Sequence, residues 1–184
     1  GSSLARPILG KKSTLEKMSG AWLKEYKRTH YLPDQVVVSL AGSFEDSFVE
    51  ELKDRFSTLE PGKQTRHKPA VYHPALTLKR KATEQNHLLL AFPSLSDVDP
   101  RRFTMQLLSS ILGGGMSSQL FQEVREQRGL CYNVYTYGSS YQEIGTFHIY
   151  AALNKETEQQ ALTAIRETIE RFVQEGVSEA ELNR

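Results

Sequence analysis

Residues 107–141 read LLSSILGGGMSSQLFQEVREQRGLCYNVYTYGSSY, and this stretch decides the fold. Its first part has apolar residues at helical spacing, which together with the preceding residues predicts a helix over 100–112. Three consecutive glycines at 113–115 end that helix. A short second helix follows, and β-branched and aromatic residues then predict a strand over 131–141.

The sequence on either side of this stretch predicts the rest of one sheet. A turn separates 131–141 from a second apolar segment, 146–153, which predicts antiparallel pairing. Upstream, LTLKRKA (76–82) and HLLLAF (87–92) predict a hairpin, and 156–174 has the apolar spacing of a helix. We therefore expect an α+β fold, with a mainly antiparallel sheet and helices packed on one face.

The N-terminal part predicts a second group of elements. A capping pattern precedes a short helix at 14–17, and a firmer helix follows at 20–30. QVVVSLAG (35–42) is apolar on both faces, which predicts a buried strand, and 46–57 predicts a helix. We also expect the strand at 35–41 to occupy an open edge of the sheet, within one chain or exchanged between chains.

A linker is predicted at 61–75, which has three prolines and no apolar period. It separates residues 1–60 from residues 76–184. If the chain has a domain boundary, the sequence places it here.

Charge and composition exclude several classes of protein. The chain has 23 Lys and Arg against 22 Asp and Glu, a net charge of +1, so it does not bind nucleic acid by charge alone. No apolar run approaches the length of a membrane span, and no signal peptide is visible. The single cysteine, Cys131, allows no internal disulfide, and no nearby histidine supports it as a catalytic thiol.

The histidines do not predict a metal site. No two of them have the i, i+4 spacing of a helical zinc site, so surface or turn positions explain them. They are His30, His67, His73, His87 and His148.

Two features of 107–141 point to function. Gly113, Gly114 and Gly115 would lose backbone entropy without a packing gain, so they suit a loop that moves or that another molecule approaches. Arg125 is predicted near a helix end and Tyr132 at a strand start. On spacing alone, a helix-terminal arginine and an ordinary sheet tyrosine are the favoured explanation of these two residues.

The segment LGGGMSSQLFQEVREQRGLCYNVYTY resembles the C-terminal domain of the pitrilysin/insulinase-type (M16) zinc metallopeptidases, and is most similar to bacterial processing-peptidase-like members. ARPILG (5–10), YLPDQVVVSLAG (31–42), the helix at 99–112 and GVSEAEL (176–182) are similar to the family in the same order. The resemblance implies that residues 1–60 end a first structural half. Residues 76–184 would then be most of a second half without zinc.

Family enzymes bind zinc through an HxxEH motif, which this sequence lacks. In the family the ARPILG-like segment follows all zinc ligands. The resemblance therefore implies no cofactor in this chain and, in a zinc-bearing parent, ligands upstream of Gly1. It also implies that Arg125 and Tyr132 bind substrate and stabilise the oxyanion, and that Gly113, Gly114 and Gly115 form a substrate-binding loop.

We expect the chain to be an inactive fragment of a zinc endopeptidase that closes two halves around a peptide. Two alternatives stay open: a non-catalytic subunit that lends Arg125 and Tyr132 to a partner, and a structural member like the respiratory-complex core subunits. The expected partners are a peptide substrate and the zinc-bearing N-terminal half or a partner subunit, and the resemblance also allows a homodimer. The resemblance implies a bacterial cytoplasmic location.

Overall fold

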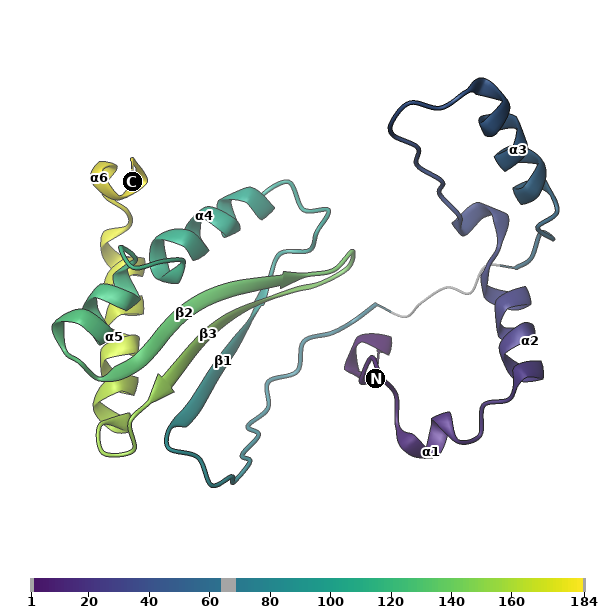
Figure 1. Cartoon of the computed structure of the whole chain (residues 1–184). Helices are drawn as coiled ribbons and strands as arrows, with labels where there is room; N and C mark the ends of the chain where they lie inside the picture. Colours follow the sequence, from purple (N-terminus) through teal and green to yellow (C-terminus); the bar gives the residue numbers. More distant parts are fainter. Residues whose placement is uncertain (1, 64–68, 184) are drawn as a thin grey trace. The chain divides into compact units, whose positions relative to one another are not determined.

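A computed structural model describes residues 2–63 and 69–183 (Figure 1). The chain divides into two units, residues 1–70 and 71–184. The division lies within 61–75, the segment whose composition predicts a linker. Of the residues discussed above, His67 lies outside the described residues.

The second unit is built on a three-stranded antiparallel sheet in the order β1-β3-β2. β1 covers Asn86–Ser94, β2 covers Cys131–Ser140 and β3 covers Gly145–Leu153. β3 is central, because it pairs along its whole length with both neighbours. β1 and β2 are therefore the two edges of this sheet.

Four helical segments belong to the same unit. They are α4 (Arg102–Gly113), the π-helix η3 (Phe121–Gln127), α5 (Glu158–Glu175) and the short α6 (Glu179–Leu182). Figure 1 shows α4 and α5 on the same side of the sheet. The predicted α+β class, with helices on one face of an antiparallel sheet, is confirmed.

Alternation along β3 explains which face of the sheet the helices cover. Phe147, Ile149 and Ala151 are buried, whereas the intervening His148 and Tyr150 are only half-buried. Because successive strand residues point to opposite faces, the first set makes the core. That core is one cluster shared by the sheet and the helices: Leu112, Leu120, Val124, Leu130, Cys131, Val134, Phe147, Ile149, Ala151, Leu153, Ala161, Ala164 and Ile165.

The described residues of the first unit form three α-helices, α1 (Lys12–Leu15), α2 (Gly20–His30) and α3 (Asp46–Ser57). The short 3-10 helices η1 (Ser3–Ala5) and η2 (Pro33–Gln35) lie between or before them. The expected helices at 20–30 and 46–57 are confirmed.

The first unit buries little of its apolar surface. Among residues 2–63 only Leu32 is buried, while the aromatic side chains of α2 and α3, such as Trp22 and Phe48, are exposed. The apolar helix faces that the sequence predicts for a core are therefore largely open to solvent here.

Two predicted strands are not formed. Residues 36–41 have no strand pairing within the described residues, and Val37 is 89 % exposed, so the buried strand expected at 35–42 is not formed. Residues 76–82 likewise have no strand, so the predicted hairpin with β1 is wrong. Both segments have strand-like composition, but a strand also needs a hydrogen-bonded partner.

Candidate functional site

Arg125 and Tyr132 lie on either side of a tight junction between η3 and β2. The turn uses Gly129, whose φ of 62° lies in the left-handed region that glycine adopts without strain. The main-chain N–H of Gly129 donates to the carbonyl of Arg125 at 3.1 Å, and that of Leu130 donates to the carbonyl of Val124 at 2.9 Å. The seven-residue spacing thus spans a helix end, a turn and the start of a strand.

A β-bulge sets the direction of the Tyr132 side chain. Cys131 is opposite Leu153 of β3, and Asn133 is opposite the adjacent Ala152, so that Tyr132 has no residue opposite it. The Cys131 side chain is buried in the core, whereas Tyr132 is 68 % exposed. Bulges commonly redirect a side chain next to a functional site, and this one places the Tyr132 phenol outside the packed sheet.

Arg125 is held by ring stacking and keeps its hydrogen-bonding capacity. Its guanidinium lies over the ring of Phe121, one helical turn earlier, at 4.6 Å from the ring centre. Its nearest carboxylate partner among the described residues is Glu126, whose oxygen is 3.9 Å from the Arg125 Nε, too far for a hydrogen bond. The guanidinium can therefore donate to an incoming acceptor.

The thiol of Cys131, at the start of β2, is buried. Burial raises the pKa of Cys131 to about 11, while the positive charge of Arg125 acts on it in the opposite direction. The thiol is therefore protonated at neutral pH, which excludes a catalytic thiolate. Arg125 on η3 and Tyr132 at the start of β2 are both solvent-accessible hydrogen-bond donors, and η3 packs against β2.

The opposite side of η3 is tied to α5 by charged side chains. Glu123 accepts hydrogen bonds from Arg128 at 2.9 Å and from Arg171 of α5 at 3.1 Å, and Arg128 also donates to Glu167 of α5 at 3.0 Å. Burial alone would raise the pKa of Glu123, but these hydrogen bonds and charges outweigh it and lower the pKa. The ionised carboxylate fixes the helix that carries Arg125.

We expect Glu123→Gln to destabilise the chain by about 1 kcal/mol at pH 7, a modest value because both arginines are partly exposed. A carboxylate whose pKa is lower in the folded state stabilises the fold at pH values above its unfolded-state pKa. That stabilisation is lost as the pH falls through the folded-state pKa. The wild-type melting temperature should therefore approach that of the variant below about pH 4. Thermal melts from pH 7 to pH 3 test this.

Glu167→Gln is the matched control, because Arg128 is the one ion-pair partner of Glu167 within the part of the chain described. Its effect should be smaller at every pH. Equal effects of the two variants would show that Glu123 is not the anchor of η3.

The three consecutive glycines do not share one environment. A Cβ on Gly113 would lie 2.6 Å from the Thr136 Cγ2 and 2.8 Å from the Thr136 main-chain nitrogen, so α4 packs against β2 only because this position has no side chain. A Cβ on Gly114 would approach the backbone of Ser110, whereas a Cβ on Gly115 would meet nothing within 4 Å. Contrary to the sequence-based interpretation, Gly113 has a packing reason.

Comparison of the sequence with known proteins identifies its family. Residues 17–184 match the model of the family described as "Peptidase M16 inactive domain". The uncharacterized zinc protease YmxG of Bacillus subtilis is 39 % identical over 98 % of this chain, and an uncharacterized zinc protease of Streptomyces coelicolor is 33 % identical over 100 % of it. The chain belongs to the M16 peptidase family.

Solved structures agree with this M16 assignment. An M16 inactive domain from Pseudomonas fluorescens matches 95 % of this chain and 43 % of its own, with a TM-score of 0.76 and 26 % identity. A protease from Helicobacter pylori matches 95 % of this chain with a TM-score of 0.73; at 18 % identity it supports the fold alone. The M16 chain spans about 44 % of YmxG and 42 % of the Streptomyces relative.

Within residues 2–63 and 69–183, no three side chains of His, Cys, Asp or Glu come together to hold a metal ion. His148 and His87 lie on the sheet, where they contact Thr146 and Tyr150. The described residues therefore do not fit the zinc that the relatives' names imply. In the same part of the chain, no helix combines the length and apolar character that crossing a membrane requires.

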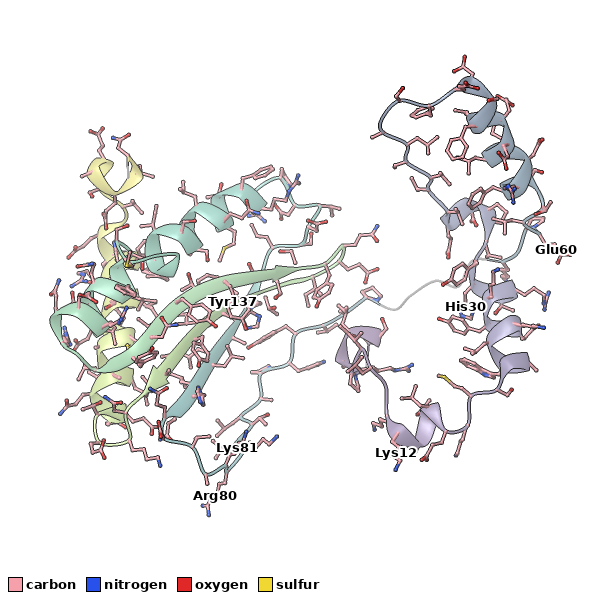
Figure 2. All side chains as sticks on the ribbon, viewed as in Figure 1. Lys12, His30, Glu60, Arg80, Lys81 and Tyr137 are labelled. Carbon is pink, nitrogen blue, oxygen red and sulfur yellow. The ribbon has the colours of Figure 1, made fainter. Side chains whose placement is uncertain are left out.

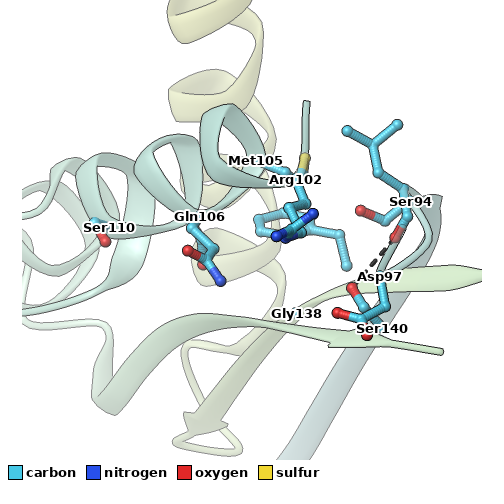
Figure 3. A pocket seen from close by; sticks show the side chains of 11 residues that line it. Ser94, Asp97, Arg102, Met105, Gln106, Ser110, Gly138 and Ser140 are labelled. Carbon is cyan, nitrogen blue, oxygen red and sulfur yellow. Dashed lines mark hydrogen bonds between the residues drawn. The ribbon is translucent and has the colours of Figure 1, made fainter. Parts of the chain in front are cut away.

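A cavity of about 560 Å³ in the M16 chain lies away from Arg125 and Tyr132. It lies among the loop after β1, α4 and the far end of β2, and Asp97, Arg102 and Gln106 are among its lining residues (Figure 3). The Ser140 hydroxyl donates to the Leu95 carbonyl at 3.2 Å on its wall. No sequence motif predicts this cavity.

Proposed function

We propose that this chain supplies the non-zinc half of a zinc-dependent endopeptidase, and that Arg125 and Tyr132 are its contribution to peptide hydrolysis. The observation that carries the proposal is the bulge that turns the Tyr132 phenol outward, next to the π-helix that holds Arg125. π-Helical turns and bulges occur often at functional sites, and here the two adjoin. The names of the bacterial relatives supply the reaction class.

Each donor has a distinct task in this proposal. Hydrolysis of a peptide bond develops negative charge on the carbonyl oxygen, and a phenol hydroxyl that donates to it lowers the barrier. Tyr132 is assigned this role because its hydroxyl is exposed and makes no hydrogen bond within the described residues. Arg125 presents a planar fork that binds a neighbouring peptide carbonyl and orients the substrate.

The metal belongs to residues elsewhere. Because the described residues do not form a zinc site, we place the zinc ligands upstream of Gly1 or in a partner subunit. Both arrangements require that two halves close on the substrate. Gly115 suits the wall of such a chamber, since its surroundings are open.

One sequence observation separates the alternatives. An HxxEH motif in the reading frame upstream of Gly1 would make the chain part of a peptidase. Its absence would favour a subunit that lends Arg125 and Tyr132 to a catalytic partner, or a member with a structural role. A complex III chain from Candida albicans has the same fold, with a TM-score of 0.78 at 17 % identity.

We expect the 184-residue chain to bind no stoichiometric zinc and to cleave no peptide. Elemental analysis of dialysed protein, together with cleavage of a quenched fluorescent peptide, measures both. A retained zinc ion whose removal by a chelator abolishes cleavage would overturn this assignment of the chain.

A further inference from the structure

The sheet has one face that no helix of its unit covers. Alternate positions on the three strands point to it: the odd residues of 87–93 on β1, the odd residues of 133–139 on β2 and the even residues of 146–152 on β3. These twelve positions are called the open face here. They lie opposite the side chains that pack against α4, η3 and α5.

The middle of the open face is a continuous set of rings. His87 stacks on Tyr150 at 6.0 Å, Tyr150 contacts Tyr135 at 4.9 Å, Tyr135 contacts Tyr137 at 6.0 Å, and Tyr137 stacks on His148 at 4.6 Å, measured between ring centres. The side chain of Tyr137 can be found on β2 in Figure 2. The rings come from all three strands, so the sheet pairing itself assembles them.

The open face carries no Asp, Glu, Lys or Arg at any of its positions. Charged residues make up 24 % of the whole chain, so twelve positions of average composition would carry about three charged residues. Burial lowers the pKa of His148, which favours the neutral form of that ring. Leu89, at the centre of β1, is 53 % exposed, and Tyr135 and Tyr137 are also exposed, whereas Ala152 at one end of the face is buried. The middle of the face is therefore uncharged and accessible.

Open surfaces of this kind mark binding sites, and the chemistry indicates the ligand. A charged side chain placed on it would lose water without gaining a partner of opposite charge. The hydroxyls of Tyr135 and Tyr137 make no hydrogen bonds within the part of the chain described, so they can donate to peptide carbonyls. Tyr132 directly precedes Asn133, the first β2 residue of the open face, so the face begins next to the proposed reaction site.

We infer that the open face binds an extended, uncharged peptide segment with aromatic or aliphatic side chains, and that it selects such segments as substrate. The substrate role rests on the proposed function. Binding and its selectivity follow from the face alone.

The test uses the 184-residue chain without metal. Three blocked, fluorescently labelled ten-residue peptides are compared by anisotropy; they differ only at alternate positions, which carry Val and Tyr, Glu, or Lys. We expect the neutral peptide to bind on the order of tenfold more tightly than either charged peptide. Equal affinity for the three peptides, or no binding of the neutral one, would overturn the inference.

Variants place the binding on this face. Leu89→Lys should weaken binding of the neutral peptide about tenfold and shift the binding preference toward the Glu peptide. Val173→Lys is the matched control, because Val173 is an exposed apolar residue on α5, 76 % exposed, and it should change no affinity. Tyr137→Ala should weaken binding of the neutral peptide without strengthening binding of either charged peptide. It replaces Leu89→Lys if circular dichroism shows that Leu89→Lys does not fold. Unchanged affinities in these variants would contradict the inference.

Sedimentation of the unliganded chain tests the competing occupant. Dimers that Leu89→Lys disrupts would show that a second copy covers the open face, which would also overturn the inference. The proposed function fails separately: normal turnover of Tyr132→Phe in a longer zinc-bearing protein would remove the catalytic role of that residue and leave peptide selectivity unaffected.

Discussion

Tyr132→Phe is expected to lower the turnover number of the full-length, zinc-loaded protein by roughly 10²–10³, the cost of losing one oxyanion donor. The substitution removes a hydroxyl from a side chain that is 68 % exposed, so packing of the sheet should be unchanged. KM should change less than the turnover number, because the hydrogen bond strengthens only as charge develops on the substrate oxygen. Steady-state kinetics with a peptide substrate measure both constants.

Tyr141→Phe is the matched control for this experiment. Tyr141 lies just beyond the end of β2, outside the open face, and is 51 % exposed. Its hydroxyl also has no hydrogen-bond partner among the described residues, but it follows the bulge by several residues. Its turnover number should stay within about twofold of wild type. If both variants turn over normally with zinc retained, Tyr132 is an ordinary sheet tyrosine.

Local patterns predict much of this fold because they depend on neighbours along the chain. The 3.6-residue apolar period locates α2, α3 and α5 to within about two residues. The Ser-x-x-Glu pattern of Ser178 and Glu181 is likewise local, and it forms a capping box with reciprocal hydrogen bonds. The strand predictions for 36–41 and 76–82 are wrong for the opposite reason. A strand needs a partner strand that is distant in the sequence, and local composition does not show whether one is present.

The site is less predictable than the fold. Spacing identifies Arg125 and Tyr132 only through the family resemblance, because a π-helical turn and a bulge each depend on a shift of hydrogen bonds that leaves no clear residue pattern. The rings of the open face are partly visible in the sequence, as the alternate Tyr135 and Tyr137. Their contacts with Tyr150 and His148 follow from strand register, which the sequence does not state.

Gly113→Ala is expected to destabilise the chain by about 2 kcal/mol and to lower its melting temperature by about 5–10 °C. An alanine in a helix would ordinarily gain about 1 kcal/mol over glycine. Here its Cβ would lie 2.8 Å from the main-chain nitrogen of Thr136, inside the sheet. Thr136 cannot yield easily, because its hydroxyl donates to the Ser109 carbonyl of α4 at 2.7 Å.

Gly115→Ala provides the comparison within the same run of glycines. Its Cβ would meet nothing within 4 Å, and its φ is not in the left-handed region, so alanine should fit and stabilise slightly by restricting the unfolded chain. Thermal melts of the two variants therefore distinguish a glycine that is needed for packing, Gly113, from one that is only part of a loop, Gly115. If Gly115→Ala slows hydrolysis by the full-length protein while its melting temperature holds, the loop acts on substrate. If Gly113→Ala melts like wild type, α4 can shift away from β2, and the packing explanation for that glycine is wrong.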